Sequence, residues 1–225
     1  MAKFIFRLIF YLLFWIGGWV GLRSLPQGLE LLNRQLFLET QKYKYIFIIG
    51  LAVWIAIFIT LLVYKHSFGR LNIFKFEPDK LNVFLLLITG TLLIANFVAI
   101  FFIREKNLSG LTICLVGVTF YYFSDTLFQQ IINFGFLQEG FSKIVSPAVT
   151  VLGVSAFFAA SHFLAMLEGA KFSEVLGLVV MAFFLGLIFG GLRLKYGSII
   201  PGFLIHFGIY LFWNGPLLLL LQKGI

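Results

Sequence analysis

Three ionisable residues, Asp125, His162 and His206, lie inside apolar segments of membrane length. A carboxylate and two imidazoles can move protons, activate a water molecule or bind a metal ion. A charged side chain at the centre of a bilayer costs roughly 2.5–3.5 kcal/mol on insertion scales, so such residues usually face a protein interior or a hydrated cavity. We therefore expect these three residues to mark a site inside the membrane.

Polar residues follow Asp125 at helical spacing. Asp125, Gln129 and Asn133 are four residues apart and share one face of an α-helix, and Ser124 precedes them. Such a face is either the wall of a hydrated site or a hydrogen-bonded polar seam between helices. The spacing is compatible with both interpretations.

Each histidine is paired with an aromatic residue four positions away. Phe158 and His162 share a helix face, as do His206 and Tyr210. A lone histidine in a membrane helix usually makes a hydrogen bond to a neighbouring helix. Two histidines in separate segments, with a carboxylate in a third, favour a functional site.

Two further chemistries use the same three residues. Two histidines and one carboxylate could supply three ligands to zinc or another divalent metal, although no HExxH motif is present. A serine–histidine–aspartate triad could be completed by Ser155 or Ser161, but no nucleophile-elbow motif accompanies either serine. Both remain weaker hypotheses than activation of a water molecule.

The composition predicts that the elements positioning these residues are membrane helices. The chain has 225 residues, of which 61% are hydrophobic and 12% charged, and its mean hydropathy is +1.03. A soluble domain carries about 25% charged residues. We therefore expect an all-α, polytopic integral membrane protein that forms one domain over residues 1–225.

The charge pattern supports contact with lipid rather than with nucleic acid. The net charge is +8, and the 17 lysines and arginines lie almost entirely between the apolar segments. This is the pattern of membrane-flanking charge that contacts anionic headgroups. The basic residues divide nine to eight between the two predicted sides, so they do not predict the orientation.

About seven membrane-embedded helices, within a range of six to eight, are expected. They span residues 4–22, 45–64, 81–103, 110–137, 146–167, 174–193 and 198–221, and an interfacial helix is expected within 23–44. Gly186 and Gly190 form a small-xxx-small pattern, which predicts close packing of two helices.

Residues 115–215 resemble the CPBP superfamily. This superfamily contains the type II CAAX prenyl endopeptidases and the bacterial ABI, or bacteriocin-processing and immunity, proteins. Its motifs are a glutamate pair followed four residues later by arginine, then Phe-x-x-x-His, then His-x-x-x-Asn or Asp. The resemblance is carried by Phe158 and His162, and by residues 191–193 and 196–201 leading into His206. It implies a CAAX-protease-like helix bundle with a core at about 110–221.

The resemblance also implies roles for the two histidines. In this superfamily the first glutamate and the first histidine are thought to activate a water molecule, while the last histidine and asparagine help to hold the oxyanion. His162 would then be the partner of the base, and His206 an oxyanion donor.

The remaining motif positions differ from the pattern of the superfamily. Ser124 and Asp125 stand in place of the two glutamates, Gln129 in place of the arginine, and Tyr210 in place of asparagine or aspartate. The catalytic motifs are therefore degenerate.

Three functions follow as hypotheses. The first is a pseudoprotease that binds a membrane protein or peptide in an immunity, scaffold or regulatory role. The alternative is an atypical intramembrane endopeptidase, a hydrolase that activates a water molecule with Asp125 and His162. The third is a small transporter, which requires a continuous polar path that the sequence does not contain. We expect a multi-pass protein of the bacterial inner membrane.

Overall fold

The computed structural model describes residues 43–69, 72–102, 122–168 and 170–214, together with Phe6, Ile9, Phe10 and Leu13. Apart from isolated positions, the helix expected at 4–22 and the interfacial helix expected at 23–44 lie outside the described residues. Within the described ranges the chain is helical and contains no strand. The prediction of an all-α fold is confirmed.

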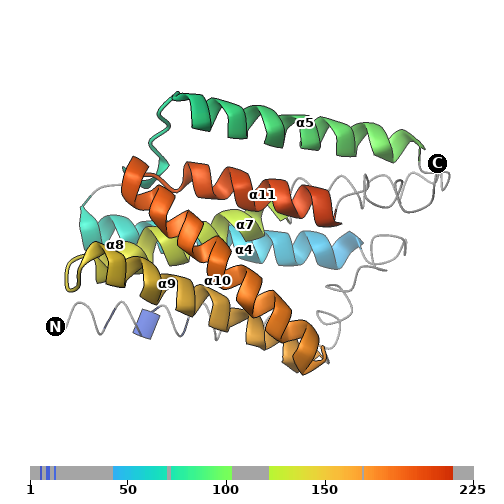
Figure 1. The fold of residues 1–225 in the computed structure, drawn as a ribbon. Coiled ribbons are helices and arrows are strands. Elements are labelled where there is room, and N and C mark those ends of the chain that lie inside the picture. The colour runs from blue at the N-terminus through green and yellow to red at the C-terminus, as the bar shows by residue number, and fades with distance from the viewer. Residues whose placement is uncertain are drawn as a thin grey trace. The chain divides into compact units, whose positions relative to one another are not determined.

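The described helices are shown in Figure 1. In chain order they are α4 (Tyr43–Phe68), η3 (Asn72–Phe74), α5 (Lys80–Phe102), α7 (Phe123–Gln129), η5 (Gln130–Leu137), α8 (Gln138–Phe141), α9 (Pro147–Ser161), η6 (His162–Glu168), α10 (Phe172–Tyr196) and α11 (Ile200–Asn214).

Among the described residues, four helices are long and apolar enough to cross a membrane. The segments are Gly50–Phe68, Lys80–Ala99, Pro147–Leu164 and Phe172–Tyr196, and Ile200–Trp213 is a shorter apolar helix. Large apolar side chains are exposed along them, for example Leu87 and Phe184, as expected for helices that face lipid. The protein is therefore of the membrane-embedded helical class, while the expected number of about seven helices is not confirmed.

Local sequence signals explain the ends of α9 and α10. Pro147 occupies the first turn of α9, where its missing N–H is not needed. At the start of α10, the Lys171 N–H donates to Glu174 Oε2 at 3.3 Å. Gly197 ends α10 in the left-handed conformation at φ 62°, which a residue with a side chain adopts only at a cost.

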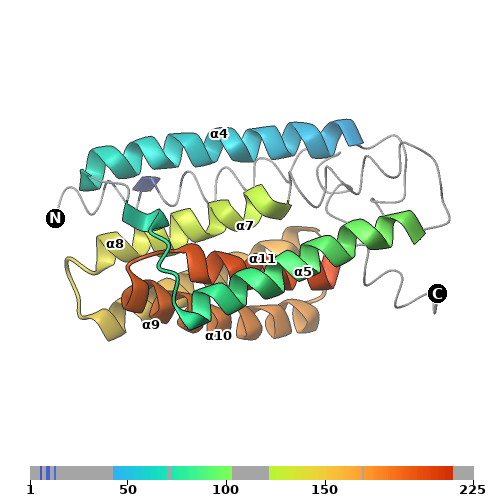
Figure 2. The same cartoon turned by 90° about the horizontal axis from the view of Figure 1, so that it is seen from above.

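The segment expected as one α-helix at 110–137 changes its helix type. α7 is α-helical, η5 is a π-helix and α8 returns to the α form, and the three follow one another without interruption (Figure 2). A π-helix is rare, and it holds i→i+5 hydrogen bonds in place of i→i+4 bonds. The described part of this helical run ends at Phe141, four residues beyond the expected end.

The chain divides into two compact units. Among the described residues, unit 1 contains 59–69, 72–76, 129–168 and 170–202, together with Phe6, Ile9, Phe10 and Leu13. Unit 2 contains 43–58, 77–102, 122–128 and 203–214. Each unit is considered by itself below. The expectation of a single domain remains a prediction.

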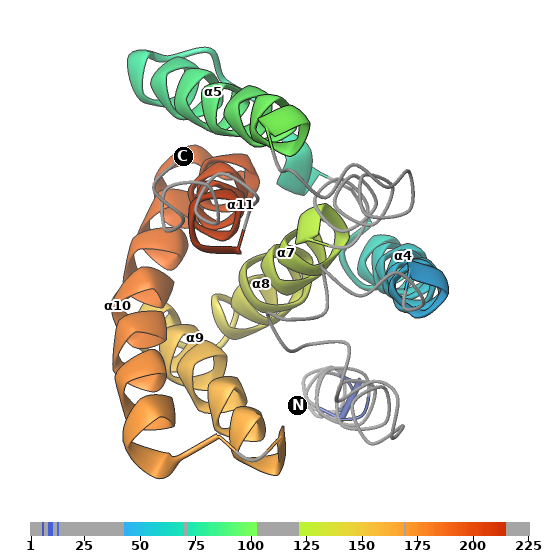
Figure 3. The same ribbon diagram turned by 90° about the vertical axis from the view of Figure 1, so that its right-hand side faces the viewer.

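In unit 1, α9 packs closely against α10 through glycine (Figures 1 and 3). A Cβ atom added to Gly186 would lie 3.0 Å from Ser155 Cα, and one added to Gly190 would lie 3.0 Å from Val151 Cγ1. A side chain at either position would press against α9, so the packing role predicted from the small-xxx-small pattern is confirmed.

In unit 2, α5 lies beside α11 and is joined to it by two polar side chains (Figures 1 and 3). Thr89 Oγ1 donates to the Leu204 carbonyl at 3.0 Å. Asn96 Nδ2 donates to the Leu211 carbonyl at 3.1 Å and also to the Leu92 carbonyl of its own helix. These bonds attach α5 to the face of α11 that carries Leu204, Gly208 and Leu211. At about 100° per residue, His206 and Tyr210 lie on the opposite face of α11.

Candidate functional site

The polar face that begins in α7 is buried. Ser124 is 0%, Asp125 2% and Gln129 4% exposed. Between Tyr122 and Gln138, the only charged residue is Asp125. The site therefore has one buried carboxylate and no lysine or arginine on its own helical run.

The polar face continues into η5 through a hydrogen bond. Asn133 Nδ2 donates to the Gln129 carbonyl at 2.9 Å. Both residues are buried. The bond from the Asn133 side chain to the Gln129 backbone carbonyl shows that residues four apart remain neighbours where the helix changes from the α to the π form. The two amides thus form a buried polar patch within unit 1.

Aromatic contacts hold the start of α7 against α11 within unit 2. The Phe123 ring packs edge-on against Phe203 at 5.1 Å and against Phe207 at 5.4 Å between ring centroids. The ring of Tyr122 lies 5.5 Å from that of Tyr210. Edge-to-face pairs of this kind stabilise a contact beyond their apolar area. Because Ser124 and Asp125 come directly after these rings, the contacts position the carboxylate-bearing turn beside α11.

His206 lies on the same face of α11 as these aromatic residues. It is 4% exposed, and its ring stands at 62° to the Tyr210 ring with centroids 5.3 Å apart. The predicted His206 and Tyr210 pair is therefore formed. Asp125 and His206 belong to the same compact unit, on helices that contact each other.

His162 lies in unit 1, at the residue where α9 becomes the 3-10 helix η6. Its Nδ1 atom is 2.9 Å from the Phe158 carbonyl oxygen. Because a carbonyl oxygen only accepts hydrogen bonds, Nδ1 carries the proton, and in the neutral ring the basic lone pair is on Nε2. A histidine that acts as a base or as a metal ligand through Nε2 must be in this tautomer.

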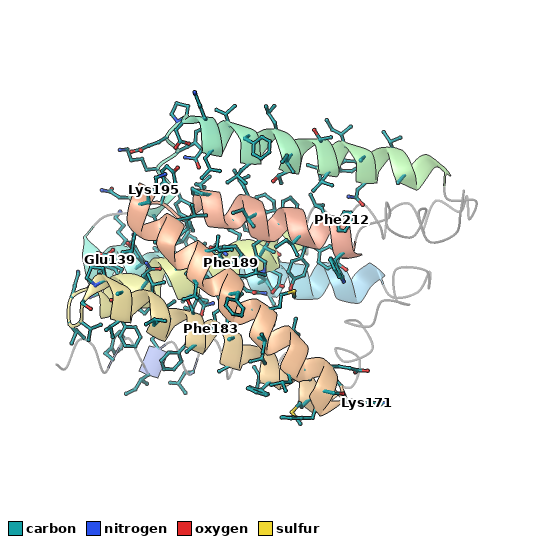
Figure 4. All side chains as sticks on the ribbon, viewed as in Figure 1. Glu139, Lys171, Phe183, Phe189, Lys195 and Phe212 are labelled. Carbon is teal, nitrogen blue, oxygen red and sulfur yellow. The ribbon has the colours of Figure 1, made fainter. Side chains whose placement is uncertain are left out.

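Three buried phenylalanines support His162. The His162 ring stands at 86° to the Phe158 ring, with centroids 5.0 Å apart. Phe158 in turn contacts Phe134 at 5.5 Å and Phe189 at 6.1 Å, and all three phenylalanines are at most 1% exposed. Phe189 is labelled on α10 in Figure 4. The motif residue Phe158 therefore positions the imidazole with both its ring and its carbonyl group.

Neither serine has the arrangement of a triad nucleophile. Ser161 Oγ donates to the Phe158 carbonyl at 2.7 Å, and Ser155 Oγ donates to the Val151 carbonyl at 2.7 Å. A serine hydroxyl has a single proton, so in both residues this proton is bonded to the backbone of the same helix rather than to a histidine. The hypothesis of a serine triad gains no support from this geometry.

A metal site with three protein ligands is also not seen in the part of the chain that the structure describes. No group of three His, Cys, Asp or Glu residues there could hold a metal ion. Asp125 and His206 belong to unit 2 and His162 to unit 1, so a zinc site made by these three residues remains a hypothesis.

The candidate residues divide between the two units. Gln129, Phe158 and His162 belong to unit 1. Ser124, Asp125, His206 and Tyr210 belong to unit 2. Their joint action in one site remains a prediction.

Sequence reasoning missed several residues that position the histidines. Phe134 and Phe189 are two of 30 phenylalanines, and no local pattern distinguishes them. Thr89 and Asn96 did carry a signal, because each is a polar residue inside an apolar span. A search for single polar residues in apolar runs would have found both.

Comparison with known proteins agrees with the resemblance seen in the motifs. Residues 111–212 match the family model described as type II CAAX prenyl endopeptidase Rce1-like. This range includes every candidate residue of the site. No curated protein and no solved structure matches the chain. Over residues 111–212 the chain therefore carries the sequence pattern of the Rce1-like CAAX prenyl endopeptidases, which is consistent with the CPBP superfamily.

Proposed function

We propose that this chain is a non-proteolytic protein of the CAAX-protease-like fold that binds a membrane protein or a membrane peptide. Its role would be in immunity, scaffolding or regulation, and its location would be the bacterial inner membrane. The proposal combines the Rce1-like match over residues 111–212 with the chemistry of the buried side chains on α7.

The observation that carries the proposal is the replacement of the first glutamate by Ser124. This residue is completely buried, and a hydroxyl group cannot act as a carboxylate base at neutral pH. Gln129 replaces the arginine, so the fixed cation that would orient a carboxylate pair is also absent from this position.

Asp125 is a poor substitute for the missing glutamate. Its side chain is shorter by one methylene group, and its position is rotated by about 100° around the helix from that of Ser124. Displacements near 1 Å can reduce a catalytic rate by about 100-fold. We therefore expect hydrolysis to be lost even though a carboxylate is present.

The groups that would bind a peptide retain hydrogen-bond donors, although Tyr210 replaces the asparagine or aspartate of the motif. His206 and Tyr210 are packed together on α11, and both can donate hydrogen bonds to a peptide carbonyl. Such donors would hold an extended backbone without breaking it, which supports a binding role for the site.

The test uses the substrate class for which the matching family is named. A prenylated peptide ending in a CAAX sequence is incubated with the purified wild type and with His162→Ala, and the products are identified by mass spectrometry. We expect no hydrolysis above that of His162→Ala. We expect retention of the peptide in a binding assay, weakened roughly 2–12-fold in His206→Ala by the loss of one hydrogen bond. Hydrolysis that depends on His162 would overturn the proposal.

The second candidate function is an atypical endopeptidase that uses Asp125 and His162. The hydrogen bond from His162 Nδ1 to the Phe158 carbonyl favours it, because it leaves Nε2 as the basic atom. This hypothesis expects a loss of about 100-fold or more in the rate of hydrolysis for both Asp125→Asn and His162→Ala. If only one of the two substitutions reduces the rate, the two residues do not act together.

A further inference from the structure

Buried polar groups gather where α8, α9 and α10 meet inside unit 1. Gln138 on α8 is 2% exposed, and Thr150 on α9 is completely buried. Gln138 Nε2 donates to the Gly190 carbonyl of α10 at 3.0 Å. A Cβ atom added to Gly190 would lie 3.0 Å from Val151 Cγ1 and 3.6 Å from Gln138 Oε1. The amide of α8 and the turn of α9 that carries Thr150 therefore lie at the same level of α10.

Four polar atoms in this part of unit 1 have no hydrogen-bond partner among the described residues. They are Gln138 Oε1, Thr150 Oγ1, Arg193 Nε and Tyr196 Oη. Folded proteins leave few buried polar side-chain atoms unpaired. Lipid supplies neither donors nor acceptors to atoms inside a membrane-spanning segment. A partner for these atoms therefore has to lie between the helices themselves.

The chemistry of the four atoms specifies the class of that partner. Gln138 Oε1 only accepts hydrogen bonds, Arg193 Nε only donates them, and a hydroxyl group does both. The charge of Arg193 is already paired, because its Nη2 atom lies 3.3 Å from Glu139 Oε2. The group therefore has no net charge that would attract an ion. A neutral molecule that both donates and accepts fits this set, and water is the smallest such molecule.

Exposure decreases from the end of α10 toward the interior of unit 1. The side chain of Arg193 is 11% exposed, and Tyr196 is 8%, Gln138 2% and Thr150 0% exposed. Tyr196, Arg193 and Gly190 follow one another at intervals of three residues, or about 4.5 Å along α10. Solvent that enters beside the end of α10 therefore meets a polar group at each turn before it reaches Gln138.

We propose that unit 1 holds an ordered water site between α8 and α9, in which one molecule bridges Gln138 Oε1 and Thr150 Oγ1. Further water, bonded to Arg193 Nε and Tyr196 Oη, connects this site to the end of α10. A buried water needs two to four polar partners, and these atoms supply them. Thr150 precedes His162 by 12 residues, or about 18 Å along the helix, so the water site is separate from that histidine.

A double-mutant cycle measures whether Gln138 and Thr150 share a water molecule. Gln138→Met and Thr150→Val remove the polar atoms and approximately keep the side-chain volumes. The equilibrium constant for unfolding in detergent is measured for the wild type, both single variants and the double variant. We expect the effect of the double variant to differ from the product of the single effects by at least about twofold.

A second cycle on the same helix is the matched control. It combines Gln138→Met with Ser155→Ala, because the Ser155 hydroxyl is bonded to the Val151 carbonyl of its own helix. The two effects should multiply in this cycle. Multiplicative effects of Gln138→Met and Thr150→Val as well would overturn the proposal.

Thr150→Val alone provides a further measurement. A hydroxyl group that is bonded to water loses this bond, so the variant should unfold at a lower temperature than the wild type. A hydroxyl group that is buried without a partner would give the opposite result, because valine removes an unsatisfied polar group. A higher unfolding temperature for Thr150→Val would therefore overturn the water site.

Nuclear magnetic resonance separates a bridging water from a direct contact between the two side chains. The protein is perdeuterated and labelled at its valine methyl groups, and nuclear Overhauser effects to the water signal are recorded. Val151 and Gln138 Oε1 both lie within 4 Å of the Cβ position of Gly190, so we expect a cross-peak between Val151 and water. Val154, which is completely buried on the same helix, is the control and should have none.

The Val151 cross-peak should disappear in Gln138→Met, which keeps the threonine hydroxyl. A cross-peak that persists in this variant would overturn the bridging position. Coupling in the double-mutant cycle without a cross-peak in the wild type would assign a direct contact between Gln138 and Thr150, and would also overturn the proposal.

Discussion

His162 Nδ1 donates a hydrogen bond to the Phe158 carbonyl at 2.9 Å, and the rings of the same two residues meet edge-on at 5.0 Å. The Phe-x-x-x-His motif therefore acts through two separate contacts. The carbonyl determines which nitrogen carries the proton, and the phenyl ring determines where the imidazole lies. Because the carbonyl belongs to the backbone, substitution of the Phe158 side chain removes only the ring contact.

Phe158→Ala should destabilise the protein by about 3 kcal/mol. Its ring is 1% exposed and contacts Phe134 and Phe189, and removal of a buried phenyl ring leaves a cavity. Phe163→Ala is the matched control, because the Phe163 ring is 38% exposed. The free energy of unfolding in detergent, measured for both variants, checks the difference. Equal losses would contradict the buried aromatic support described for His162.

Gly186→Ala should destabilise unit 1 by about 1–3 kcal/mol. The new Cβ atom would lie 3.0 Å from both Cα and Cβ of Ser155, and the Cα atom cannot move without moving α9. Gly177→Ala on the same helix is the control, since nothing lies within 4 Å of its Cβ position. The control should be unchanged or up to about 1 kcal/mol more stable, because alanine is the better helix former. Thermal unfolding of the two variants provides the measurement, and similar values for both would argue against the α9 and α10 contact.

Thr89→Val should cost about 0.6 kcal/mol, a typical value for one hydrogen bond between membrane helices. The substitution keeps the shape of the side chain but removes the donor to the Leu204 carbonyl. Thr91→Val on the exposed side of α5 is the control and should have little effect. Chemical unfolding of both variants measures the difference. A larger loss for Thr91→Val would contradict the packing of α5 on α11.

If the loss of motif residues is the reason that the site is inactive, restoring the motif at three positions should create hydrolytic activity. The variant carries Ser124→Glu, Asp125→Glu and Gln129→Arg. We expect hydrolysis of a prenylated CAAX peptide to rise by at least about 100-fold over the wild type, which is the lower range for general acid–base catalysis. The same variant with His162→Ala is the control and should be inactive.

The restored protein must be shown to be folded by its elution as a single species and by its thermal unfolding. A folded but inactive variant would contradict motif loss as the sole reason for inactivity. Activity that persists in the His162→Ala control would contradict the role assigned to that histidine.

Hydrophobic runs and local capping signals predict much of the helical architecture. α10 was expected at 174–193 and is found at Phe172–Tyr196. Lys171, Glu174 and Gly197 are local signals that account for these ends. By contrast, the π-helical form of η5 was not expected. Hydropathy reports only that this segment is apolar, whereas the helix type depends on backbone hydrogen bonding that the packed structure selects.

The sequence by itself determined the class of the protein, the three candidate ionisable residues and the resemblance to the CPBP superfamily, because composition and motif spacing are properties of the linear chain. Only the tertiary structure decided which phenylalanines support His162 and which glycines allow α9 to pack closely against α10. These relationships join residues far apart in the chain, such as Phe158 with Phe189 and Ser198 with Ile73. Contacts of this kind depend on how helices pack, and no local pattern of residues encodes them.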